Sequence, residues 1–186
     1  MKYAEVILVD ENDKMIGALE KMEAHRRGIL HRAFSIFIFN SEGEMLLQRR
    51  AREKYHSGGL WTNACCSHPV PGEEVEDAAC RRLQEELGFS THLKKIFDFR
   101  YKAEFENGLT ENEFDHVFVG NYDGEINHNK DEVMGVKYMG LDKIDSDLSL
   151  NPDHYTAWFR IAFPKVQNWA INNLFKQEKQ NDNFVK

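Results

Sequence analysis

The sequence predicts an α+β fold in which a mixed β-sheet is layered against helices. Two patterns lead to this prediction. Short aromatic and β-branched runs recur between turn residues over most of the chain, which is typical of antiparallel hairpins. Apolar residues at three-to-four spacing occur in the middle of the chain and again near its end, which is typical of amphipathic helices. The 186 residues suit a single domain, 1–186, with an ample core.

The first part of the chain is predicted to form a strand, a short helix and a hairpin. Residues 6–9 are a short apolar strand, and residues 19–25 are a helix broken by the sequence Arg-Arg-Gly that follows. The best strand in the sequence is 32–39, because its residues are aromatic or β-branched. A turn over 40–43 then leads to its hairpin partner over 44–49.

The central unit combines a strand, a turn and a helix. Residues 61–69 alternate like a strand and lead through Pro71 and Gly72 into a helix over 75–87. Gly88 follows directly and is predicted to end that helix. The apolar face of the helix is Val75, Ala78, Ala79, Leu83 and Leu87.

The rest of the chain is predicted to add three strands and more helix. Residues 92–105 and 109–122 form a long hairpin around a turn of the type Glu-Asn-Gly, and 133–139 form another strand before a short helix at 141–144. An apolar stripe then indicates a helical segment over 153–178, which Pro164 is expected to kink or restart. The polar residues 177–186 are expected to fray.

Composition excludes several classes of function. A formal net charge of −7 and a pI near 5.6 leave no electrostatic footprint for nucleic acid. Three cysteines, two of them adjacent, are a poor disulfide framework and fit reduced thiols in the cytoplasm. The most apolar window, residues 33–39, is too short to span a bilayer, and the N-terminus lacks the layout of a signal peptide. We therefore expect a soluble cytoplasmic protein without a nucleic-acid or membrane partner.

Two pairs of residues spaced by two place reactive groups on one face of a strand. Glu111 and Glu113 would repel each other unless a cation or a proton lies between them, although a solvated strand face is the simpler interpretation of a lone pair. Cys66 and His68 form the second pair if their segment is extended.

Histidines elsewhere in the chain extend these pairs into a candidate metal site. His25 and His31 are six residues apart, so they converge only if the chain turns at Gly28 between them. A mixed set of imidazoles and carboxylates suits ions such as Zn, Fe or Mn, with added carboxylates favouring harder ions. The candidate ligands are His25, His31, His68, Glu111 and Glu113, and their spacing alone leaves open whether they converge.

The residues around the central unit also allow more than one interpretation. Free cysteine is often a small buried hydrophobe, a role that fits Cys65 if Cys66 faces the same side as His68. The Cys66 thiol could then donate a proton or, as thiolate, act as a nucleophile. Glu85 and Glu86 are either solvent-facing charges or part of the site. The flanking cations Arg49, Arg50, Arg52, Lys54, Arg81 and Arg82 are either surface charges or contacts for phosphate.

The central unit resembles the Nudix box, the pattern Gly, five residues, Glu, seven residues, Arg-Glu-aliphatic-x-Glu-Glu-x-Gly-aliphatic. Glu73, Arg81, Leu83, Glu85, Glu86 and Gly88 stand at matching positions. Ser67 stands at the first Gly, Arg82 at the first Glu of the cluster, and Phe89 at the last aliphatic position. Nudix hydrolases use that cluster to hold divalent metals and activate water, so the loss of a carboxylate implies a Nudix fold redirected from hydrolysis.

A fuller match covers nearly the whole chain, which is similar to the type 1 isopentenyl-diphosphate isomerases. The matching stretches begin with Leu19-Glu20-Lys21 and His25, Leu30 to Ser35, and Gln48 to Ala51. They continue with Trp61-Thr62-Asn63, Cys66 to Pro69, Asp98 to Tyr101, Glu111-Asn112-Glu113 and Trp158. This resemblance implies a Nudix-like core at about 30–148, with N-terminal and C-terminal extensions that cover the active site. Bacterial members commonly carry Gly where Ser67 stands, which leaves the local turn geometry open.

The resemblance also implies roles for individual residues. One divalent ion, Mn²⁺, Zn²⁺ or Mg²⁺, would be held by His25, His31, His68, Glu111 and Glu113. A Mg²⁺ bridging the substrate diphosphate would be held by Glu86 and the carbonyl of Cys66. Cys66 and Glu113 would be the acid/base pair, with Tyr101 hydrogen-bonded in the site, and which of the two donates stays open. Lys21, Arg50, Lys54 and Arg82 would contact the diphosphate, and Trp158 would close over the hydrocarbon.

The expected reaction moves a double bond by one carbon, converting isopentenyl to dimethylallyl diphosphate in the supply of isoprenoid precursors. A Nudix hydrolase that cleaves a diphosphate is the first alternative, and Arg82 counts against it. A non-catalytic module that binds a metal or a phosphorylated ligand is the second. The ion in the histidine site and the choice between monomer and homodimer stay open.

Overall fold

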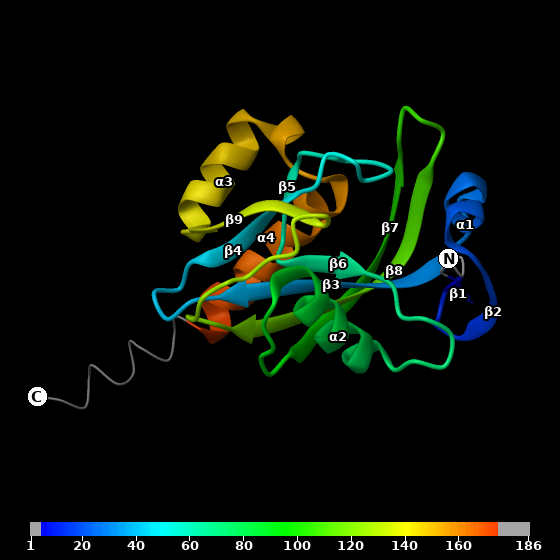
Figure 1. The fold of residues 1–186 in the computed structure, drawn as a ribbon, viewed down its shortest axis with the longest axis horizontal. Helices are drawn as coiled ribbons and strands as arrows, with labels where there is room; N and C mark the ends of the chain where they lie inside the picture. The colour runs from blue at the N-terminus through cyan, green and yellow to red at the C-terminus, as the bar shows by residue number, and fades with distance from the viewer. Residues whose placement is uncertain (1–4, 175–186) are drawn as a thin grey trace, which may run out of the picture.

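The computed structural model describes residues 5–174, which form one mixed sheet of nine strands with helices on both faces (Figure 1). The strands are β1 (Glu5–Val9), β2 (Met15–Glu20), β3 (His31–Phe39), β4 (Met45–Arg50), β5 (Trp61–Thr62), β6 (Cys65–Ser67), β7 (Lys94–Glu104), β8 (Thr110–Asn121) and β9 (Val133–Met139). The helices are α1 (Lys21–Arg27), α2 (Val75–Leu87), α3 (Leu141–Leu150) and α4 (Ala157–Asn173), with a 3₁₀ turn, η1 (Pro152–His154).

Strand β3 is the centre of the sheet. It pairs in parallel with β8, where His31 lies opposite Glu113 and Phe39 opposite Asn121, and antiparallel with β6, where Ser35 lies opposite Cys66. Strands β7 and β8 form the long hairpin that extends beyond the sheet body in Figure 1. Strand β4 leaves β3 after one pair and instead joins β9 and β5.

Alternate residues of β3 face two separate apolar cores. Phe37 and Phe39 belong to the core under α4, whereas Phe34, Ile36 and Ile38 belong to the core under α2. Helices α2 and α4 accordingly lie on opposite faces of the sheet (Figure 1). Since both faces of β3 are covered, its sequence is a nearly continuous apolar run rather than an alternating one.

Most of the expected elements are confirmed, including the helix at 75–87 and the long hairpin after it. Strand β2 was not expected, and the first helix begins at Lys21 rather than at residue 19. The Glu20 side chain accepts hydrogen bonds from the backbone N–H groups of Met22 and Glu23, which fixes the start of the helix after it. The short β2 lies at the edge of the sheet with Met15 and Ile16 exposed, so it lacks the alternation that identifies a half-buried strand.

Further expectations need correction or fall outside the described residues. The segment 44–49 is a strand but pairs mainly with β9 and not with its hairpin neighbour β3. Helix α3 extends to Leu150, and α4 continues through Pro164 without restarting, because Phe163 and Val166 on either side are fully buried. The end of the predicted segment 153–178 and the polar tail 177–186 lie outside the described residues. Among residues 5–174, no helix combines the length and apolar character that crossing a bilayer requires.

Candidate active site

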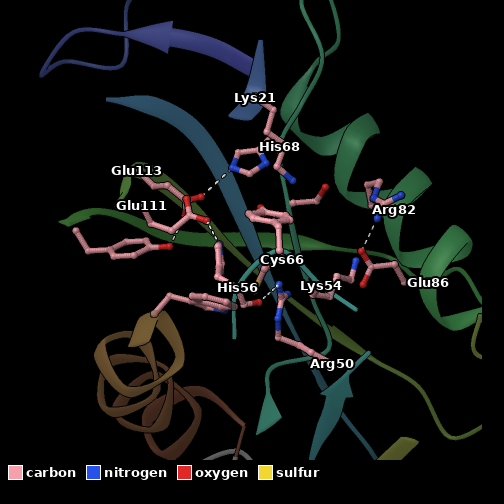
Figure 2. Close-up of a pocket in the computed structure, with 14 residues that line it drawn as sticks. Lys21, Arg50, Lys54, His56, Cys66, His68, Arg82, Glu86, Glu111 and Glu113 are labelled. Carbon is pink, nitrogen blue, oxygen red and sulfur yellow. Dashed lines mark hydrogen bonds and ion pairs between the residues drawn. The ribbon is translucent and has the colours of Figure 1, made fainter. Parts of the chain in front are cut away.

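A cavity opens where the ends of β3, β6 and β8 meet α1, α2 and α4 (Figure 2). Its walls are Lys21, Arg50, Lys54, Tyr55, His56, Cys66, Ser67, His68, Arg82, Glu86, Tyr101, Glu111, Glu113 and Trp158. Every candidate catalytic and substrate-binding residue from the sequence is therefore in the wall of this one cavity. Both extensions contribute to it, since Lys21 begins α1 and Trp158 lies in the first turn of α4.

The five candidate metal ligands meet at one end of the cavity. One nitrogen or oxygen from each of His25, His31, His68, Glu111 and Glu113 lies within 4.8 Å of all the others. Glu111 and Glu113 share a face of β8, as their spacing predicts, and the parallel register of β3 brings His31 opposite Glu113. The chain turns at Gly28 as the convergence of the two histidines requires, with a positive φ of 59° that favours glycine.

Hydrogen bonds from Nδ1 to the backbone fix the ring orientation of His25 and His31. Nδ1 of His25 donates to the carbonyl of Lys21 at 2.6 Å, and Nδ1 of His31 donates to the carbonyl of Ile29 at 2.8 Å. Because these acceptors require the hydrogen on Nδ1, the neutral tautomer leaves each Nε2 with a lone pair. Both Nε2 atoms point at the carboxylates, and Nε2 of His31 has no hydrogen-bond partner among the described residues.

These lone pairs face carboxylate oxygens, so the cluster needs a positive charge at its centre. Nε2 of His25 lies 2.8 Å from Glu111, and Nε2 of His68 lies 2.8 Å from Glu113. Burial opposes the charged form of His31, but Glu111 and Glu113 outweigh it and raise the pKa of His31 to about 10. A proton or a divalent cation satisfies this demand, and the mixed nitrogen and oxygen donor set fits a metal ion.

His56 belongs to this cluster although sequence reasoning missed it. Its Nε2 lies 2.5 Å from the Glu111 oxygen that does not face His25, and its ring stacks on Phe105 with centroids 4.3 Å apart. The basic segment that carries it, 51–59, is an irregular loop without periodicity, so no spacing links His56 to the other histidines. The contact between His56 and Oε1 of Glu111 is visible only in the tertiary structure.

The Cys66 thiol lies between the metal-ligand cluster and the cationic end of the cavity in Figure 2. Its sulfur donates to Oδ1 of Asn63 at 3.0 Å and lies 3.5 Å from Oγ of Ser35. Burial, together with the nearby charge of Asp115, raises the pKa of the Cys66 thiol to about 12. Ser67, beside it, lies in β6 without the positive φ that would call for glycine, which answers the question about the local backbone.

Tyr101 and Glu113 form a second proton-transfer group. The Tyr101 hydroxyl donates to Oε2 of Glu113 at 2.5 Å, opposite the oxygen that His68 contacts. Burial and the adjacent carboxylates raise the pKa of Tyr101 well above its ordinary value, so the phenol keeps its hydrogen. Burial and Glu111 act to raise the pKa of Glu113, but the neighbouring imidazoles of His31 and His68 outweigh them and leave that pKa below its ordinary value.

Four cations gather at the other end of the cavity, on the side of α2. Arg82 pairs with Glu86 at 2.6 Å, and Lys54 pairs with Glu132. Within the part of the chain that the structure describes, no ion pair joins Lys21 or Arg50 to a carboxylate. The Arg50 guanidinium instead lies 5.1 Å from the ring centroid of Trp158. This end of the cavity therefore holds a net positive charge that an anionic group could neutralise.

Helix α2 presents fewer carboxylates to the cavity than a complete Nudix box would. Glu86 is buried and faces the cavity, where Nε2 of Gln48 donates to it at 3.3 Å. Arg82 replaces a carboxylate and points into the same space (Figure 2). The preceding Arg81 is bound from the outside by Glu73 and Glu85.

Comparisons with known proteins agree with this geometry. The NUDIX domain model matches residues 29–159. The isopentenyl-diphosphate Delta-isomerase of Pectobacterium atrosepticum is 48% identical over 179 residues, which are 96% of this chain and 99% of that protein. Isopentenyl-diphosphate Delta-isomerase 2 of Aromatoleum aromaticum is 52% identical over 162 residues, 87% of this chain and 86% of that protein.

Solved structures support the fold alone, because their sequences are distant. A crystal structure from Deinococcus radiodurans matches with a TM-score of 0.73 at 19% identity, over 87% of this chain and 98% of that one. The MutT protein of Methanosarcina mazei Go1 matches with a TM-score of 0.61 at 20% identity, over 75% of this chain and 94% of that one.

Proposed function

The chain belongs to the Nudix family and, within it, to the isopentenyl-diphosphate Delta-isomerases, and from this membership we propose how its cavity performs the reaction. The enzyme interconverts isopentenyl diphosphate and dimethylallyl diphosphate. The double bond moves by one carbon, so one proton is added to the hydrocarbon and another is removed. The active site must therefore place two proton-transfer groups beside the alkene and bind the diphosphate through other residues.

A single observation carries this assignment: Cys66, the Tyr101–Glu113 pair and the four cations are in the wall of one cavity. An alkene bound between Cys66 and Glu113 would meet a thiol from one side and a carboxylate–phenol pair from the other. One group adds a proton and the other removes one, and they exchange these roles when the reaction runs in reverse.

Protonation of an unactivated alkene produces a tertiary carbocation, which water would trap. Trp158 is 4% exposed and forms part of the cavity wall, so its ring can exclude water from the hydrocarbon. The face of an indole also attracts a cation, and this face already lies 5.1 Å from the Arg50 guanidinium. We assign Trp158 to shielding and stabilising the developing positive charge.

The diphosphate is assigned to the cationic end of the cavity. Lys21 and Arg50 have no carboxylate partner in the described part of the chain, so both can form ion pairs with the diphosphate without losing an existing one. Lys54 and Arg82 would exchange Glu132 and Glu86 for phosphate oxygens. Binding energy from the diphosphate then fixes the alkene between the proton-transfer groups.

The described residues fit one divalent ion, and membership of the family implies a second. His25, His31, His68, Glu111 and Glu113 would hold one, for which Mn²⁺, Zn²⁺ and Mg²⁺ are the candidates. Glu86 and the carbonyl of Cys66 are the ligands that we propose for a Mg²⁺ at the diphosphate site. When bound, a divalent ion neutralises its carboxylate ligands and lowers their affinity for protons. The residues themselves orient the site, since the backbone carbonyls behind His25 and His31 fix both rings.

We further infer that the enzyme works in the cytoplasm on a free small-molecule diphosphate, as one domain and as a monomer or a homodimer. The three cysteines are all free thiols in the structure, which supports a reducing compartment. Neither of the alternative functions is favoured. Arg82 stands where a Nudix hydrolase has a carboxylate, and a non-catalytic binding module does not require the proton-transfer groups Cys66, Tyr101 and Glu113 in one cavity.

The decisive experiment is incubation with isopentenyl diphosphate and Mg²⁺ in deuterated water, with the products followed by NMR. We expect dimethylallyl diphosphate that carries deuterium, and no product from Cys66→Ala or Glu113→Gln. Cys80→Ala is the matched control, because Cys80 is an exposed thiol on α2 and should leave turnover unchanged. Release of phosphate or pyrophosphate from intact substrate would support the hydrolase, and binding without turnover would support the binding module.

A further inference from the structure

Asp115 is a buried carboxylate to which the reaction above gives no role. It is 1% exposed and lies on the same face of β8 as Glu111 and Glu113, one alternation further along the strand. Its Oδ2 accepts one hydrogen bond, and its Oδ1 has no partner among residues 5–174. A buried carboxylate with one hydrogen bond and no cationic partner is costly to the fold, so its presence calls for an explanation.

The one hydrogen bond of Asp115 leads towards the reactive thiol. Oγ of Ser35 donates to Oδ2 of Asp115 at 2.7 Å. Ser35 is 2% exposed, lies directly opposite Cys66 in the β3–β6 ladder, and places its Oγ 3.5 Å from the sulfur. With its hydrogen directed at Asp115, the Ser35 hydroxyl is held in one rotamer, and its oxygen packs against the Cys66 sulfur, whose own hydrogen goes to Asn63.

A second polar group holds the sulfur from another direction. Nδ2 of Asn63 donates to the backbone carbonyls of Ile36 at 3.0 Å and Cys65 at 2.9 Å. Because both amide hydrogens are used, Oδ1 is the atom that faces Cys66, at 3.0 Å. The backbone therefore orients Asn63, whereas Ser35 depends on a side chain, that of Asp115, for its orientation.

We propose that Asp115 is a positioning residue for the isomerisation: through Ser35 it holds the Cys66 side chain in the conformation that faces the substrate. This inference rests on the proposed role of Cys66 in proton transfer. Asp115 itself lines no part of the substrate cavity and contacts the thiol only through Ser35. Its function is to accept one hydrogen bond, so an amide oxygen at the same place serves equally well.

The test compares variants that keep or remove this acceptor. Asp115→Asn retains an oxygen for Ser35 and should keep kcat within about threefold of the wild type. Asp115→Ala removes the acceptor and should lower kcat by about tenfold or more, because a small misplacement of a reacting group costs at least that much. Ser35→Ala should cause a similar loss, and the double variant should lose no more than either single one. KM should stay unchanged in all of them, since the diphosphate contacts are distant in the cavity.

Two further readouts separate positioning from a general loss of structure. The double variant Ser35→Ala/Asp115→Ala removes donor and acceptor together, so it should be nearly as stable as the wild type while its kcat stays low. Asp115→Ala alone leaves the buried Ser35 hydroxyl without an acceptor and should be less stable. A crystal structure of this variant should show Cys66 in more than one side-chain conformation, and that of the wild type in one. The matched control is Asp123→Ala, which removes the acceptor of the Ser41 hydroxyl at the same 2.7 Å on an exposed turn and should leave kcat unchanged.

The positioning role is overturned if Asp115→Ala keeps wild-type kcat, if Asp115→Asn loses as much as Asp115→Ala, or if the losses of Ser35→Ala and Asp115→Ala multiply. Failure of the isomerase assignment has a different signature, since wild-type protein itself would then give no product. In that case the conformation of Cys66 in the Asp115→Ala crystal structure still decides the inference. If Asp115→Ala does not fold, Ser35→Ala carries the test, because it removes only one oxygen.

Discussion

Single residues that contact the candidate metal ligands contribute to the order of the site. His56 is such a residue, since it contacts the outer oxygen of Glu111 and is itself held between Phe105 and Trp158. Partners of this kind orient a ligand without touching the ion.

We predict that His56→Ala weakens binding of the divalent ion at the histidine cluster by about tenfold, within the range typical of outer-shell partners. Competition against a coloured chelator measures this directly, without substrate. The exposed His154→Ala is the control and should bind the ion as the wild type does. Unchanged affinity in His56→Ala would show that Glu111 needs no support from this side.

Lys54 gives the site a pH dependence that can be assigned to one group. Burial, with Arg50, Lys21 and Arg82 nearby, lowers the pKa of Lys54 to about 8 against the opposing charge of Glu86. A lysine is charged below its pKa, so the proposed attraction of Lys54 for the diphosphate is nearly complete at pH 7 and is lost as the pH rises past 8.

KM for the diphosphate should therefore rise between about pH 7.5 and 9 in the wild type. In Lys54→Arg this rise should be absent, because a guanidinium stays charged over the whole range. Steady-state kinetics at constant ionic strength tests both statements. A rise of equal size in Lys54→Arg would assign the pH dependence to another group.

At the scale of elements, a buried chain of hydroxyls joins the start of α4 to the loop before Cys66. Oγ1 of Thr156 donates to Oγ1 of Thr62, and Oγ1 of Thr62 donates to Oδ1 of Asn63, each at 2.9 Å. All three side chains are fully buried. The helix that carries Trp158 is thereby linked to the loop that holds the thiol.

Thr62→Val keeps the shape of this side chain but leaves Thr156 without its acceptor. We expect the free energy of unfolding to fall by about 1–3 kcal/mol, the usual cost of an unsatisfied buried polar group. Denaturant unfolding measures this, with Thr62→Ser as the control that retains the hydroxyl. A Thr62→Val variant as stable as the wild type would show that the chain contributes nothing.

The turn before α2 is tied to the helix by an ion pair with a predictable pH dependence. Nε and Nη2 of Arg81 donate to the two oxygens of the Glu73 carboxylate, at 2.7 and 2.8 Å. The hydrogen bond from Arg81 holds the pKa of Glu73 below its usual value of 4.5. The stability that this pair contributes is present above pH 4.5 and is lost as the pH falls through the lowered folded-state pKa.

Glu73→Gln should consequently reduce stability by no more than about 1 kcal/mol at pH 7, since the pair is partly exposed. The difference between variant and wild type should shrink towards zero as the pH falls below 4.5 and through the lowered folded-state pKa of Glu73. Thermal unfolding at several pH values measures the difference. A constant gap at all pH values would contradict the ion-pair explanation.

At the scale of the whole molecule, one ion would link segments that are far apart in the sequence. Its ligands come from α1, β3, the residue directly after β6, and β8, so binding joins the N-terminal extension to the central sheet. A ligand that binds only the folded state stabilises it in proportion to the logarithm of its concentration.

Removal of divalent ions with a chelator should lower the unfolding temperature of the wild type by several degrees, and restoring the ion should reverse this. His25→Ala should unfold at the same temperature with and without chelator. Calorimetry gives both temperatures. A shift in His25→Ala as large as in the wild type would place the stabilising ion elsewhere.

The sequence by itself determined the features that depend on neighbours along the chain. Aromatic and β-branched residues identified strand β3, turn residues identified the β7–β8 hairpin, and periodicity identified the helix α2, because side chains repeat every 3.6 residues in a helix and every two in a strand. The same rule placed Glu111 and Glu113 on one face. Matches in order along the chain, from Lys21 to Trp158, indicated the family and its candidate ligands.

Only the tertiary structure decided which of these segments meet. The parallel register of β3 and β8 puts His31 opposite Glu113, and the left-handed turn at Gly28 brings His25 to the same point. Only such contacts show that His56 and Asp115 lie near the other site residues. His56 is in an irregular loop and Asp115 continues the alternation of Glu111 and Glu113, so neither position is marked by a sequence pattern of its own. Strand register and loop closure depend on packing between residues distant in sequence, and no local pattern of amino acids encodes those distances.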